Sequence, residues 1–304
     1  MTLYLPIAEL SVNWLVIVGL GALVGFLSGM FGVGGGFLTT PLLIFYGIPP
    51  AVAVASSATQ ITGASVSGAL AYWRRGGVDL KMGAVLVAGG FVGAGLGSVL
   101  FAWLQQLGQI DITINLVYVL LLGTVGGLML RESVLTMRRT AKGAKPARLH
   151  AHNPLIAALP WKTRFYKSGI YISPLAPFLL GAIVGLLTVS LGVGGGFIMV
   201  PAMIYLLGMS TSSVLGTSLF QIIFVTAATT LLHSVDSHTV DIILAGLLLI
   251  GGVIGAQLGV RAAQRVSPVR LRLGLALILL GVAGRLAIGL ALRPAELFSV
   301  FGPA

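Results

Sequence analysis

The sequence predicts an all-α polytopic membrane protein made of two inverted-topology repeats. Hydrophobic residues make up 57% of the 304 positions and charged residues only 8%, whereas soluble domains carry about 25% charged residues. Several apolar runs approach the roughly 20 residues that a helix needs to cross a hydrocarbon core. They are Trp14–Phe31, Met82–Leu104, Ile112–Leu130, Val240–Val260 and Leu271–Leu292. These runs lack the alternation of polar and apolar residues that marks a transmembrane β-barrel, which excludes that fold.

A glycine-rich element marks the repeat. "FGVGGGF" at Phe31–Phe37 returns as "LGVGGGF" at Leu191–Phe197. Further matches follow in the same order: Pro41 with Pro201, Gly47 with Gly208, Ser57 with Ser218, Gln60 with Gln221, Asp79 with Asp241, and Gly89, Gly90, Gly93 and Gly97 with Gly251, Gly252, Gly255 and Gly259. We therefore expect residues 1–130 to form a first transmembrane repeat, residues 131–173 a basic cytoplasmic linker and residues 174–304 a second repeat.

The distribution of basic residues predicts the orientation of the two repeats. Nine of the 18 Lys and Arg residues lie between Arg131 and Lys167, a concentration typical of cytoplasmic loops. With this linker inside, counting helices outward places Arg74 and Arg75 inside in the first repeat and Arg261 inside in the second. Equivalent loops of the repeats then differ in charge, so the repeats are inverted and both termini lie outside. We expect a multi-pass protein of a bacterial-type plasma membrane.

The net charge of +11 raises the alternative of nucleic-acid binding, but half of the basic residues are concentrated in one loop. Trp161, Phe165 and Tyr166 stand among them, a mixture that suits the anionic surface of the cytoplasmic leaflet. The expected partners are therefore the lipid bilayer and a small anionic substrate, and not nucleic acid. The sequence leaves the oligomeric state open.

The segments after the glycines are too short to cross a membrane. Phe37–Ile48 and Phe197–Gly208 each contain 12 residues, which rise about 18 Å as a helix against a core of about 30 Å. We expect two half-helices of this kind, entered through the glycine breaks, beside about eight full transmembrane helices. Inverted repeats with broken helices are typical of secondary transporters that work by alternating access.

The N-terminus of a half-helix offers unpaired N–H groups and a partial positive charge, so the glycine breaks are candidate anion sites. The candidate residues are Gly34, Gly35, Gly36, Gly194, Gly195 and Gly196. The alternative is close packing of helices against small residues. For the glycines spaced by four, from Gly89 to Gly97 and from Gly251 to Gly259, packing is the favoured interpretation.

Polar side chains recur in the next helix of each repeat. Ser57 and Gln60 share a helix face, as do Ser218 and Gln221, because they are three residues apart. Neutral donors of this kind bind an anion without trapping it, which makes these four residues candidates for substrate binding. The alternative is hydrogen bonding between helices.

Five further residues are candidates for gating or structural roles: Pro41, Pro201, Asp79, Asp241 and Arg285. The two aspartates are expected at helix ends, as helix caps or gate residues. Arg285 falls near the middle of an apolar run. It can snorkel to the interface, pair with a carbonyl group or offer a positive charge to a substrate.

Two copies of G-x-G-G-G-F-x-x-x-P, each followed by a helix with hydroxyl groups and a glutamine, resemble the TauE/SafE family of membrane proteins. "SGALAYWRRGGVDLKMG" at Ser67–Gly83 is similar to the family's continuation of the first repeat. The resemblance implies export of sulfite, of organosulfonates such as sulfoacetate, and more loosely of other sulfur-containing anions. Val235–Thr239 replaces the Arg-Arg-Gly-Gly turn in the second repeat, so a role of those arginines is not duplicated.

An enzyme is not expected, because the sequence has no histidine cluster, no G-x-S-x-G elbow and no paired carboxylates within an apolar run. There is no cysteine, and no metal or other cofactor is expected. A membrane potential supplies about 2.3 kcal/mol per charge per 100 mV, enough for a roughly fiftyfold gradient of a monoanion. We therefore expect potential-driven uniport or weakly coupled transport. Transport of another small solute, or a scaffold without transport, are the alternatives.

Overall fold

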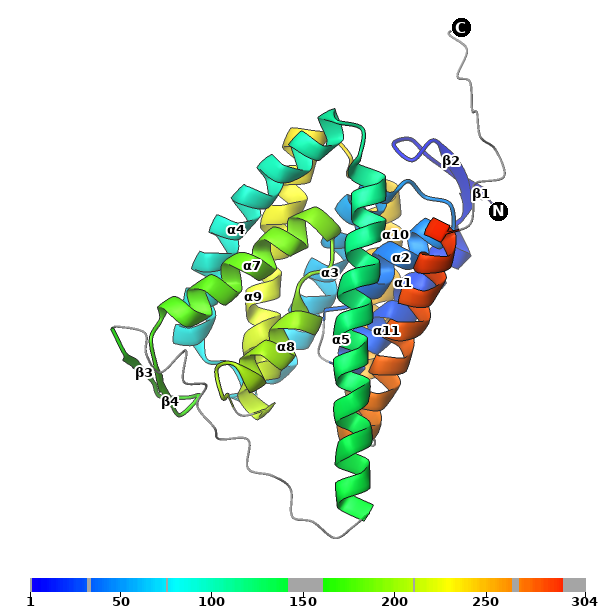
Figure 1. The fold of residues 1–304 in the computed structure, drawn as a ribbon. Coiled ribbons are helices and arrows are strands. Elements are labelled where there is room, and N and C mark those ends of the chain that lie inside the picture. Colours follow the sequence, from blue (N-terminus) through cyan, green and yellow to red (C-terminus); the bar gives the residue numbers. More distant parts are fainter. Residues whose placement is uncertain are drawn as a thin grey trace, which may run out of the picture.

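The computed structural model describes residues 2–31, 34–74, 76–141, 161–209, 211–263 and 268–291. Within these residues the first part of the chain forms α1 (Trp14–Phe31), α2 (Gly36–Phe45), α3 (Pro50–Trp73), α4 (Leu80–Gln106) and α5 (Ile110–Ala141). The second part forms α7 (Leu175–Leu191), α8 (Gly196–Tyr205), α9 (Thr211–Leu232), the π-helical turn η1 (His233–Ser237), α10 (Ile242–Ala263) and α11 (Pro268–Ala291). Figure 1 shows these elements as one helical bundle.

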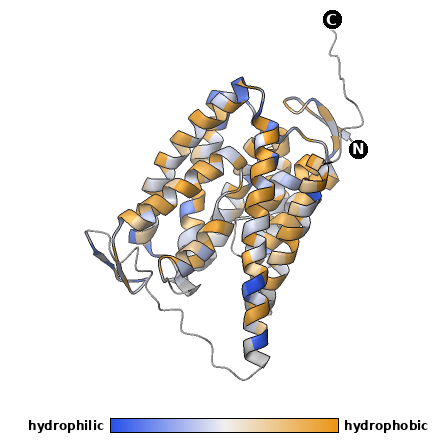
Figure 2. Ribbon diagram, in the orientation of Figure 1, coloured by the Kyte–Doolittle hydropathy of each residue, from blue (hydrophilic) through white to orange (hydrophobic). Residues whose placement is uncertain are grey.

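Six helices of the described chain are long and apolar enough to cross a membrane, namely α1, α4, α5, α9 together with η1, α10 and α11. The other described α-helices are not among them: α2 and α8 have 10 residues each and α7 has 17, and α3 carries the polar stretch Ser56–Thr62. Apolar residues cover most of the helical surface in Figure 2, while hydrophilic residues gather at the lower end of α5. The chain is thus an all-α polytopic membrane protein, as the sequence predicts.

The helices associate in four close pairs. Helix α1 packs along α10, α4 along α7, α5 along α11 and α3 along α9. Helix α3 also contacts α10, and α9 also contacts α4. The pair α3–α9 therefore joins the other helices at the centre of the bundle.

Two of these pairs depend on glycine. A Cβ atom added to Gly93 in α4 would lie 1.8 Å from the carbonyl oxygen of Ala182 in α7, and one added to Gly255 in α10 would lie 2.0 Å from that of Ala22 in α1. Such distances leave no room for any side chain, so the backbones touch. The same holds at Gly89, Gly97, Gly251 and Gly259, where the nearest backbone oxygen would be 2.0–2.8 Å away. The packing role expected for these glycines is confirmed.

One short β-hairpin precedes the first helix of each part of the chain. Strand β1 (Thr2–Leu5) pairs with β2 (Leu10–Asn13), and β3 (Thr163–Phe165) pairs with β4 (Ile170–Ile172). Neither hairpin was expected from the sequence. Helix α5 continues to Ala141, so the predicted linker begins as helix and ends as a hairpin. Residues 142–160, which include His150 and His152, and residues 292–304 lie outside the described residues.

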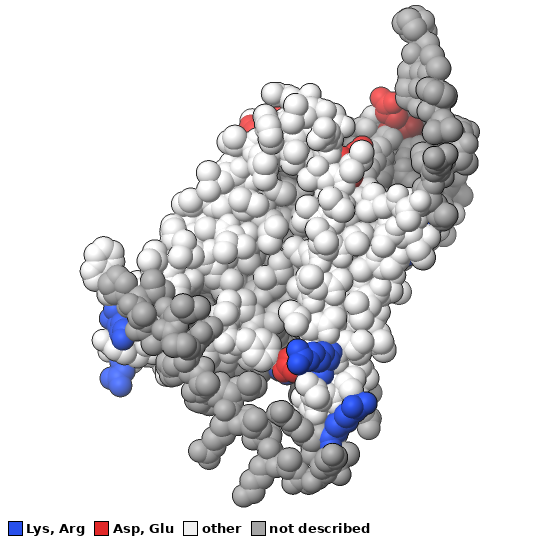
Figure 3. Space-filling model, viewed as in Figure 1, with Lys and Arg blue, Asp and Glu red and all other residues white. Residues whose placement is uncertain are grey.

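The two ends of the bundle differ in charge. Exposed basic residues, including Arg131, Arg138, Lys162 and Arg164, lie on the lower part of α5 and on the β3–β4 hairpin. Figure 3 shows this end with Lys and Arg groups, and the opposite end with Asp and Glu groups. Such a gradient is what the preference of basic residues for the cytoplasmic side produces in a membrane protein.

Candidate solute site at the glycine breaks

The two short helices begin at the glycine breaks. Gly35 and Gly195 precede α2 and α8 with φ angles of 76° and 71°, a left-handed conformation that glycine adopts without strain. Each helix has 10 residues and rises about 15 Å. Both end earlier than the sequence suggested, because Gly47 and Gly208 just beyond them are also left-handed, with φ of 95° and 73°.

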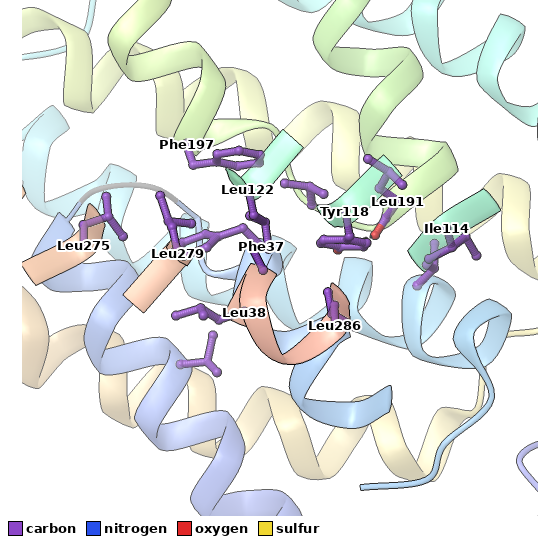
Figure 4. Packing of buried hydrophobic residues seen from close by; sticks show 14 of the residues in the cluster. Phe37, Leu38, Ile114, Tyr118, Leu122, Leu191, Phe197, Leu275, Leu279 and Leu286 are labelled. Atoms are coloured by element: carbon purple, nitrogen blue, oxygen red, sulfur yellow. Dashed lines mark hydrogen bonds between the residues drawn. The ribbon is translucent and has the colours of Figure 1, made fainter. Parts of the chain in front are cut away.

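The two breaks meet in the interior of the bundle. The rings of Phe37 and Phe197, one at the start of each short helix, have centroids 5.7 Å apart and are tilted by 42°; both lie in the packed cluster drawn in Figure 4. A Cβ atom on Gly36 would lie 2.5 Å from the carbonyl oxygen of Gly192. The hydroxyl group of Tyr118 in α5 donates to the carbonyl oxygen of Leu191 at 2.6 Å. Segments far apart in the sequence therefore form one packed centre.

Isoleucine side chains cover this centre from α3 and α9. A Cβ atom on Gly34 would lie 3.1 Å from Cδ1 of Ile222, and one on Gly194 would lie 2.8 Å from Cγ2 of Ile61. Both isoleucines are fully buried. In this conformation methyl groups therefore lie over the glycine breaks, and a solute reaches the backbone there only after these side chains move.

In the first half the predicted polar residues are paired. The Thr39 hydroxyl of α2 donates to Oε1 of Gln60 in α3 at 2.7 Å. The hydroxyl groups of Thr40 and Ser57 lie 2.9 Å apart, and Ser57 also lies 3.2 Å from the carbonyl oxygen of Gly192. All of these side chains are buried. The structure thus joins Ser57 and Gln60 to the short helix of their own half, and Ser57 also to the break of the other half.

In the second half the corresponding residues are not paired in this way. Ser218 donates to the carbonyl oxygen of Leu215 in its own helix at 3.0 Å. Gln221 is fully buried, and among the described residues neither its amide nitrogen nor its amide oxygen has a hydrogen-bond partner. The α8 positions that correspond to Thr39 and Thr40 hold Met199 and Val200. An unpaired buried polar group is unfavourable by about 1–3 kcal/mol, so the Gln221 amide is a candidate contact for a solute.

The Gln221 amide lies between α9 and α4. A Cβ atom on Gly90 of α4 would be 3.3 Å from the amide nitrogen, whereas one on Gly252 of α10 would be 2.8 Å from the amide nitrogen of Gln60. Glycine at these two positions therefore makes room for a glutamine in each half. The difference between the halves lies in the hydrogen bonds and not in the space around the amides.

A line of threonine hydroxyl groups joins α3 and α9 nearby. The hydroxyl groups of Thr62 and Thr226 lie 2.8 Å apart, and those of Thr59 and Thr230 lie 3.3 Å apart. A Cβ atom on Gly194 would lie 3.7 Å from the methyl carbon of Thr226. These threonines are not among the site residues predicted from the sequence. The spacing of four between Thr226 and Thr230 in an apolar helix was the available signal.

Asp79 connects the start of α4 to the β3–β4 hairpin. One carboxylate oxygen accepts the Met82 backbone N–H at 3.1 Å, which caps the helix. The other oxygen accepts the backbone N–H of Ser168 at 3.0 Å and its hydroxyl group at 2.6 Å. The Asp79 backbone N–H donates to the Thr217 hydroxyl of α9 at 3.0 Å. The aspartate is thus both a helix cap and a latch for the hairpin.

Asp241 makes the corresponding connection at the other end. One carboxylate oxygen accepts the backbone N–H groups of Ile243 and Leu244 at 3.1 and 3.0 Å. The other accepts the backbone N–H of Ile7, in the β1–β2 hairpin, at 3.1 Å. The Asp241 backbone N–H donates to the Ser56 hydroxyl of α3 at 3.1 Å. We call the Asp79–Ser168 and Asp241–Ile7 contacts the two hairpin latches.

The remaining candidates lie away from the packed centre or inside the short helices. Pro41 and Pro201 are interior residues of α2 and α8. Arg285 is exposed on α11, with its guanidinium carbon 5.3 Å from the centroid of the Phe45 ring at the end of α2. Within the described residues no group of three or more His, Cys, Asp or Glu side chains could hold a metal ion.

Comparison with known proteins identifies the family. The sequence profile described as "Sulfite exporter TauE/SafE" matches residues 17–286, a range that contains both glycine breaks and both latch aspartates. The chain belongs to the TauE/SafE family. Members of this family are membrane transporters, so the chain is a membrane transporter and not an enzyme.

Curated relatives of this TauE/SafE protein are also named as transporters. A "Probable membrane transporter protein" of Xylella fastidiosa (strain Temecula1 / ATCC 700964) is 32% identical over 255 residues, which cover 83% of this chain and 86% of the relative. The "Probable membrane transporter protein YjnA" of Bacillus subtilis (strain 168) is 31% identical over 267 residues, covering 87% and 96%. No solved structure matches the chain at a significant level.

Proposed function

We propose that this transporter exports small anions, most of all sulfur-containing oxyanions such as sulfite and sulfoacetate, by alternating access around the packed centre of the glycine breaks. The observation that carries the proposal is the fully buried Gln221 amide, which has no partner among the described residues. A substrate oxygen that accepts from this amide would satisfy the group. The choice of sulfur anions rests on the family to which the chain belongs.

Reciprocal contacts support two inverted repeats, with residues 1–130 and 174–304 as the repeats and residues 131–173 as the linker. The first helix of each part packs along the fourth helix of the other, α1 with α10 and α7 with α4. Each hairpin is latched to the aspartate that begins the fourth helix of the other part. Two parts related in this way can exchange conformations, which is the basis of alternating access in inverted-repeat transporters.

The charge gradient supports the orientation of the protein. The end with the lower part of α5 and the β3–β4 hairpin carries exposed Lys and Arg residues, so it faces the cytoplasm of a bacterial-type cell. The β1–β2 hairpin, and with it the N-terminus, then lies outside, as does the end of α11. In this orientation the Asp79 latch lies on the cytoplasmic side and the Asp241 latch lies on the outer side.

The centre suits an anion that passes without being trapped. Its polar groups are neutral amides and hydroxyl groups: Gln60, Gln221, Ser57, Thr62 and Thr226. Neutral donors stabilise an oxyanion by hydrogen bonds and leave it free to dissociate, because no fixed opposite charge holds it. Ile61 and Ile222 are the side chains that move to admit the solute, since they cover Gly194 and Gly34.

The test is efflux of labelled sulfite or sulfoacetate from proteoliposomes, with the membrane potential clamped by potassium and valinomycin. Gln221→Leu is expected to lower efflux about tenfold or more, because a hydrogen bond to an anion contributes about 1.5–3 kcal/mol. Gln60→Leu is the matched comparison of equal size change, and it is expected to lower efflux less because Thr39 holds the Gln60 side chain through Oε1, whereas neither polar atom of Gln221 has a partner among the described residues.

Three results would count against parts of the proposal. Efflux that is equal in wild type and Gln221→Leu would move the site away from this amide. If folded protein transported no sulfur anion, sulfur-containing anions would be excluded as substrates and another solute would be favoured. Loss of flux on collapse of the pH gradient alone, with the potential held, would replace potential-driven uniport by proton coupling.

A further inference from the structure

The β3–β4 hairpin has two faces of different chemistry. Side chains of a strand alternate between its faces, and here Phe165, Ile170 and Ile172 are buried against the bundle. The other face points away from the bundle and consists of exposed residues: Lys162, Arg164, Tyr166 and Tyr171. Arg164 and Tyr171 are directly opposite each other in the strand pair, so the outward face combines basic and aromatic groups at close range.

The aromatic side chains at this face are largely exposed. Tyr166 is 81% exposed, Tyr171 57%, and Trp161, just before strand β3, 84%. Tyr and Trp side chains favour the boundary between hydrocarbon and water in a bilayer, because a ring enters the apolar layer while its polar group stays hydrated. Lys and Arg at the same depth attract anionic headgroups.

The position of the hairpin matches that boundary. Strand β4 ends at Ile172 and helix α7 begins at Leu175, so the hairpin lies directly before the apolar helix α7, which packs along the membrane helix α4. Figure 1 shows it at the edge of the bundle, beyond the ends of α4 and α7. Figure 3 shows Lys and Arg groups at this edge. The outward face is therefore at the depth of the lipid headgroups.

The β1–β2 hairpin provides an internal comparison. There Tyr4 lies opposite Ser11, in the places that Arg164 and Tyr171 have in the β3–β4 hairpin, and the sequence before Trp14 contains no Lys or Arg. Both hairpins make a latch with an aspartate. The basic and aromatic outward face is thus not a requirement of the hairpin fold or of the latch, and it points to a ligand at one end only.

We infer that the outward face of the β3–β4 hairpin binds the headgroups of anionic phospholipids, and that this binding holds the Asp79 latch closed. The two faces belong to one small element that is tied to the start of α4. Lys81 donates to the Arg164 carbonyl oxygen at 3.2 Å, and Lys167 donates to the Val78 carbonyl oxygen at 3.3 Å. A lipid that restrains the outward face therefore also restrains Ser168 against Asp79. The inference goes beyond the proposed function and does not depend on which solute is carried.

The experiment uses the fluorescence of Trp161 in nanodiscs of phosphatidylcholine with increasing amounts of brominated phosphatidylglycerol. The signal of Trp161 is obtained by subtracting the Trp161→Phe variant, because the chain has four tryptophans. A parallel series uses brominated phosphatidylcholine. We expect the anionic lipid to quench Trp161 at a lower mole fraction than the neutral lipid does.

Two matched double variants decide the role of charge. Lys162→Gln/Arg164→Gln removes two exposed basic residues from the hairpin, and Arg131→Gln/Arg138→Gln removes two from α5 at the same end of the bundle. The hairpin variant is expected to raise the half-quenching mole fraction of the anionic lipid about fivefold or more. The α5 variant is expected to leave it unchanged.

Each other result overturns the inference. Equal quenching by both lipids means that the face touches the bilayer without selecting charge. No quenching by either lipid means that the face is turned to water, where a soluble acidic partner would be the alternative. An equal shift in both double variants means that only the general charge of this end matters. None of these readouts involves transport, so they are separate from the test of the proposed function.

Discussion

The short helix and the following helix of the first half, α2 and α3, can be compared with their counterparts in the second half, α8 and α9. Both short helices start at a left-handed glycine, have 10 residues and contain one proline. Their polar contacts differ. In the first half Thr39 and Thr40 bind Gln60 and Ser57, whereas in the second half Gln221 has no partner among the described residues.

Two segments with similar sequence motifs and similar backbone geometry therefore need not share the same hydrogen-bond chemistry. Gln60 and Gln221 occur in equivalent sequence patterns, yet among the described residues only the Gln60 amide is hydrogen-bonded to the neighbouring short helix. A buried polar group that is satisfied by the protein stabilises the fold, while one that is left unsatisfied is available to a ligand. The predictions below test where the halves agree and where they differ, in order of decreasing expected effect.

The largest effect on stability is expected at the close helix crossings, which α4 and α7 form in the same way as α1 and α10. Gly93→Ala and Gly255→Ala each place a methyl group within 2.0 Å of a backbone oxygen. Since backbone cannot move aside as a side chain does, each variant is expected to lose about 3 kcal/mol or more of stability. Thermal unfolding in detergent and the yield of folded protein measure the loss.

Gly95→Ala is the matched control in the same helix, because a Cβ atom there meets nothing within 4 Å. It is expected to be neutral or to stabilise α4 by up to about 1 kcal/mol, since alanine favours helix over glycine. Similar melting temperatures for Gly93→Ala and Gly95→Ala would contradict the backbone contact between α4 and α7.

The latches are expected to give the next largest effect. Asp79→Ala removes a helix cap and leaves the Ser168 donors unpaired, which should lower stability by about 2–4 kcal/mol. Asp241→Ala also removes three accepted hydrogen bonds, two at the start of α10 and one from the hairpin, so a loss of similar size is expected. Hydrogen exchange at Ser168 and Ile7 would report each latch separately.

Ser168→Ala is the milder test of the same contact. It removes the hydrogen bond from the Ser168 hydroxyl group to Asp79 but keeps the hydrogen bond from the backbone N–H. A loss of about 1 kcal/mol of stability is expected. Exchange at the β1–β2 hairpin should not change. An equal acceleration at both hairpins would mean that the two latches are not independent.

The glutamines are expected to change stability in opposite directions. Gln60→Leu leaves the Thr39 hydroxyl without its amide acceptor, for an expected loss of about 1–2 kcal/mol. Gln221→Leu removes an unpaired buried amide and should be neutral or stabilising. Melting temperatures of both variants without substrate measure this, and a clear loss in Gln221→Leu would indicate that its amide is satisfied within the protein.

The smallest effect on stability is expected at the end of the short helix α8. Tyr205 at the end of α8 donates to Glu132, which lies 3.6 Å from the guanidinium group of Arg272. Both charged side chains are about one-third exposed, so Arg272→Gln should lower stability by less than about 1 kcal/mol. Unfolding at low and high salt checks the prediction, and a loss of several kcal/mol that persists at high salt would contradict it.

Much of the fold could be predicted from the sequence because it follows from local properties. Long apolar runs such as Trp14–Phe31 predicted membrane helices, and the same bounds hold for α1. Glycines spaced by four, as at Gly89 and Gly93, predicted close crossings, because small residues on one helix face allow backbones to touch. Asp79 and Asp241 were expected at helix ends, as helix caps or gate residues, and each accepts a backbone N–H group from the first turn of its helix.

The hairpins could not be predicted in this way. The segment Thr2–Asn13 is short, and it precedes a long apolar run without a strong turn signal. Its pairing depends on burial of Leu5 and Val12 against other helices. An isolated two-stranded hairpin is at most marginally stable in water, so tertiary contact decides whether it forms.

By itself the sequence determined that this protein is a polytopic helical membrane protein, which motifs recur along the chain, and which polar residues are placed inside apolar runs. These features depend on composition and on spacing along one element. The tertiary structure decided which helix pairs touch, that Ile61 and Ile222 cover the glycine breaks, and that Gln60 is paired while Gln221 is not. The physical reason is that a buried amide is satisfied only if the residue opposite it can form a hydrogen bond. That residue is Thr39 in one half and Met199 at the corresponding position of the other, and it cannot be identified from the sequence pattern of one helix.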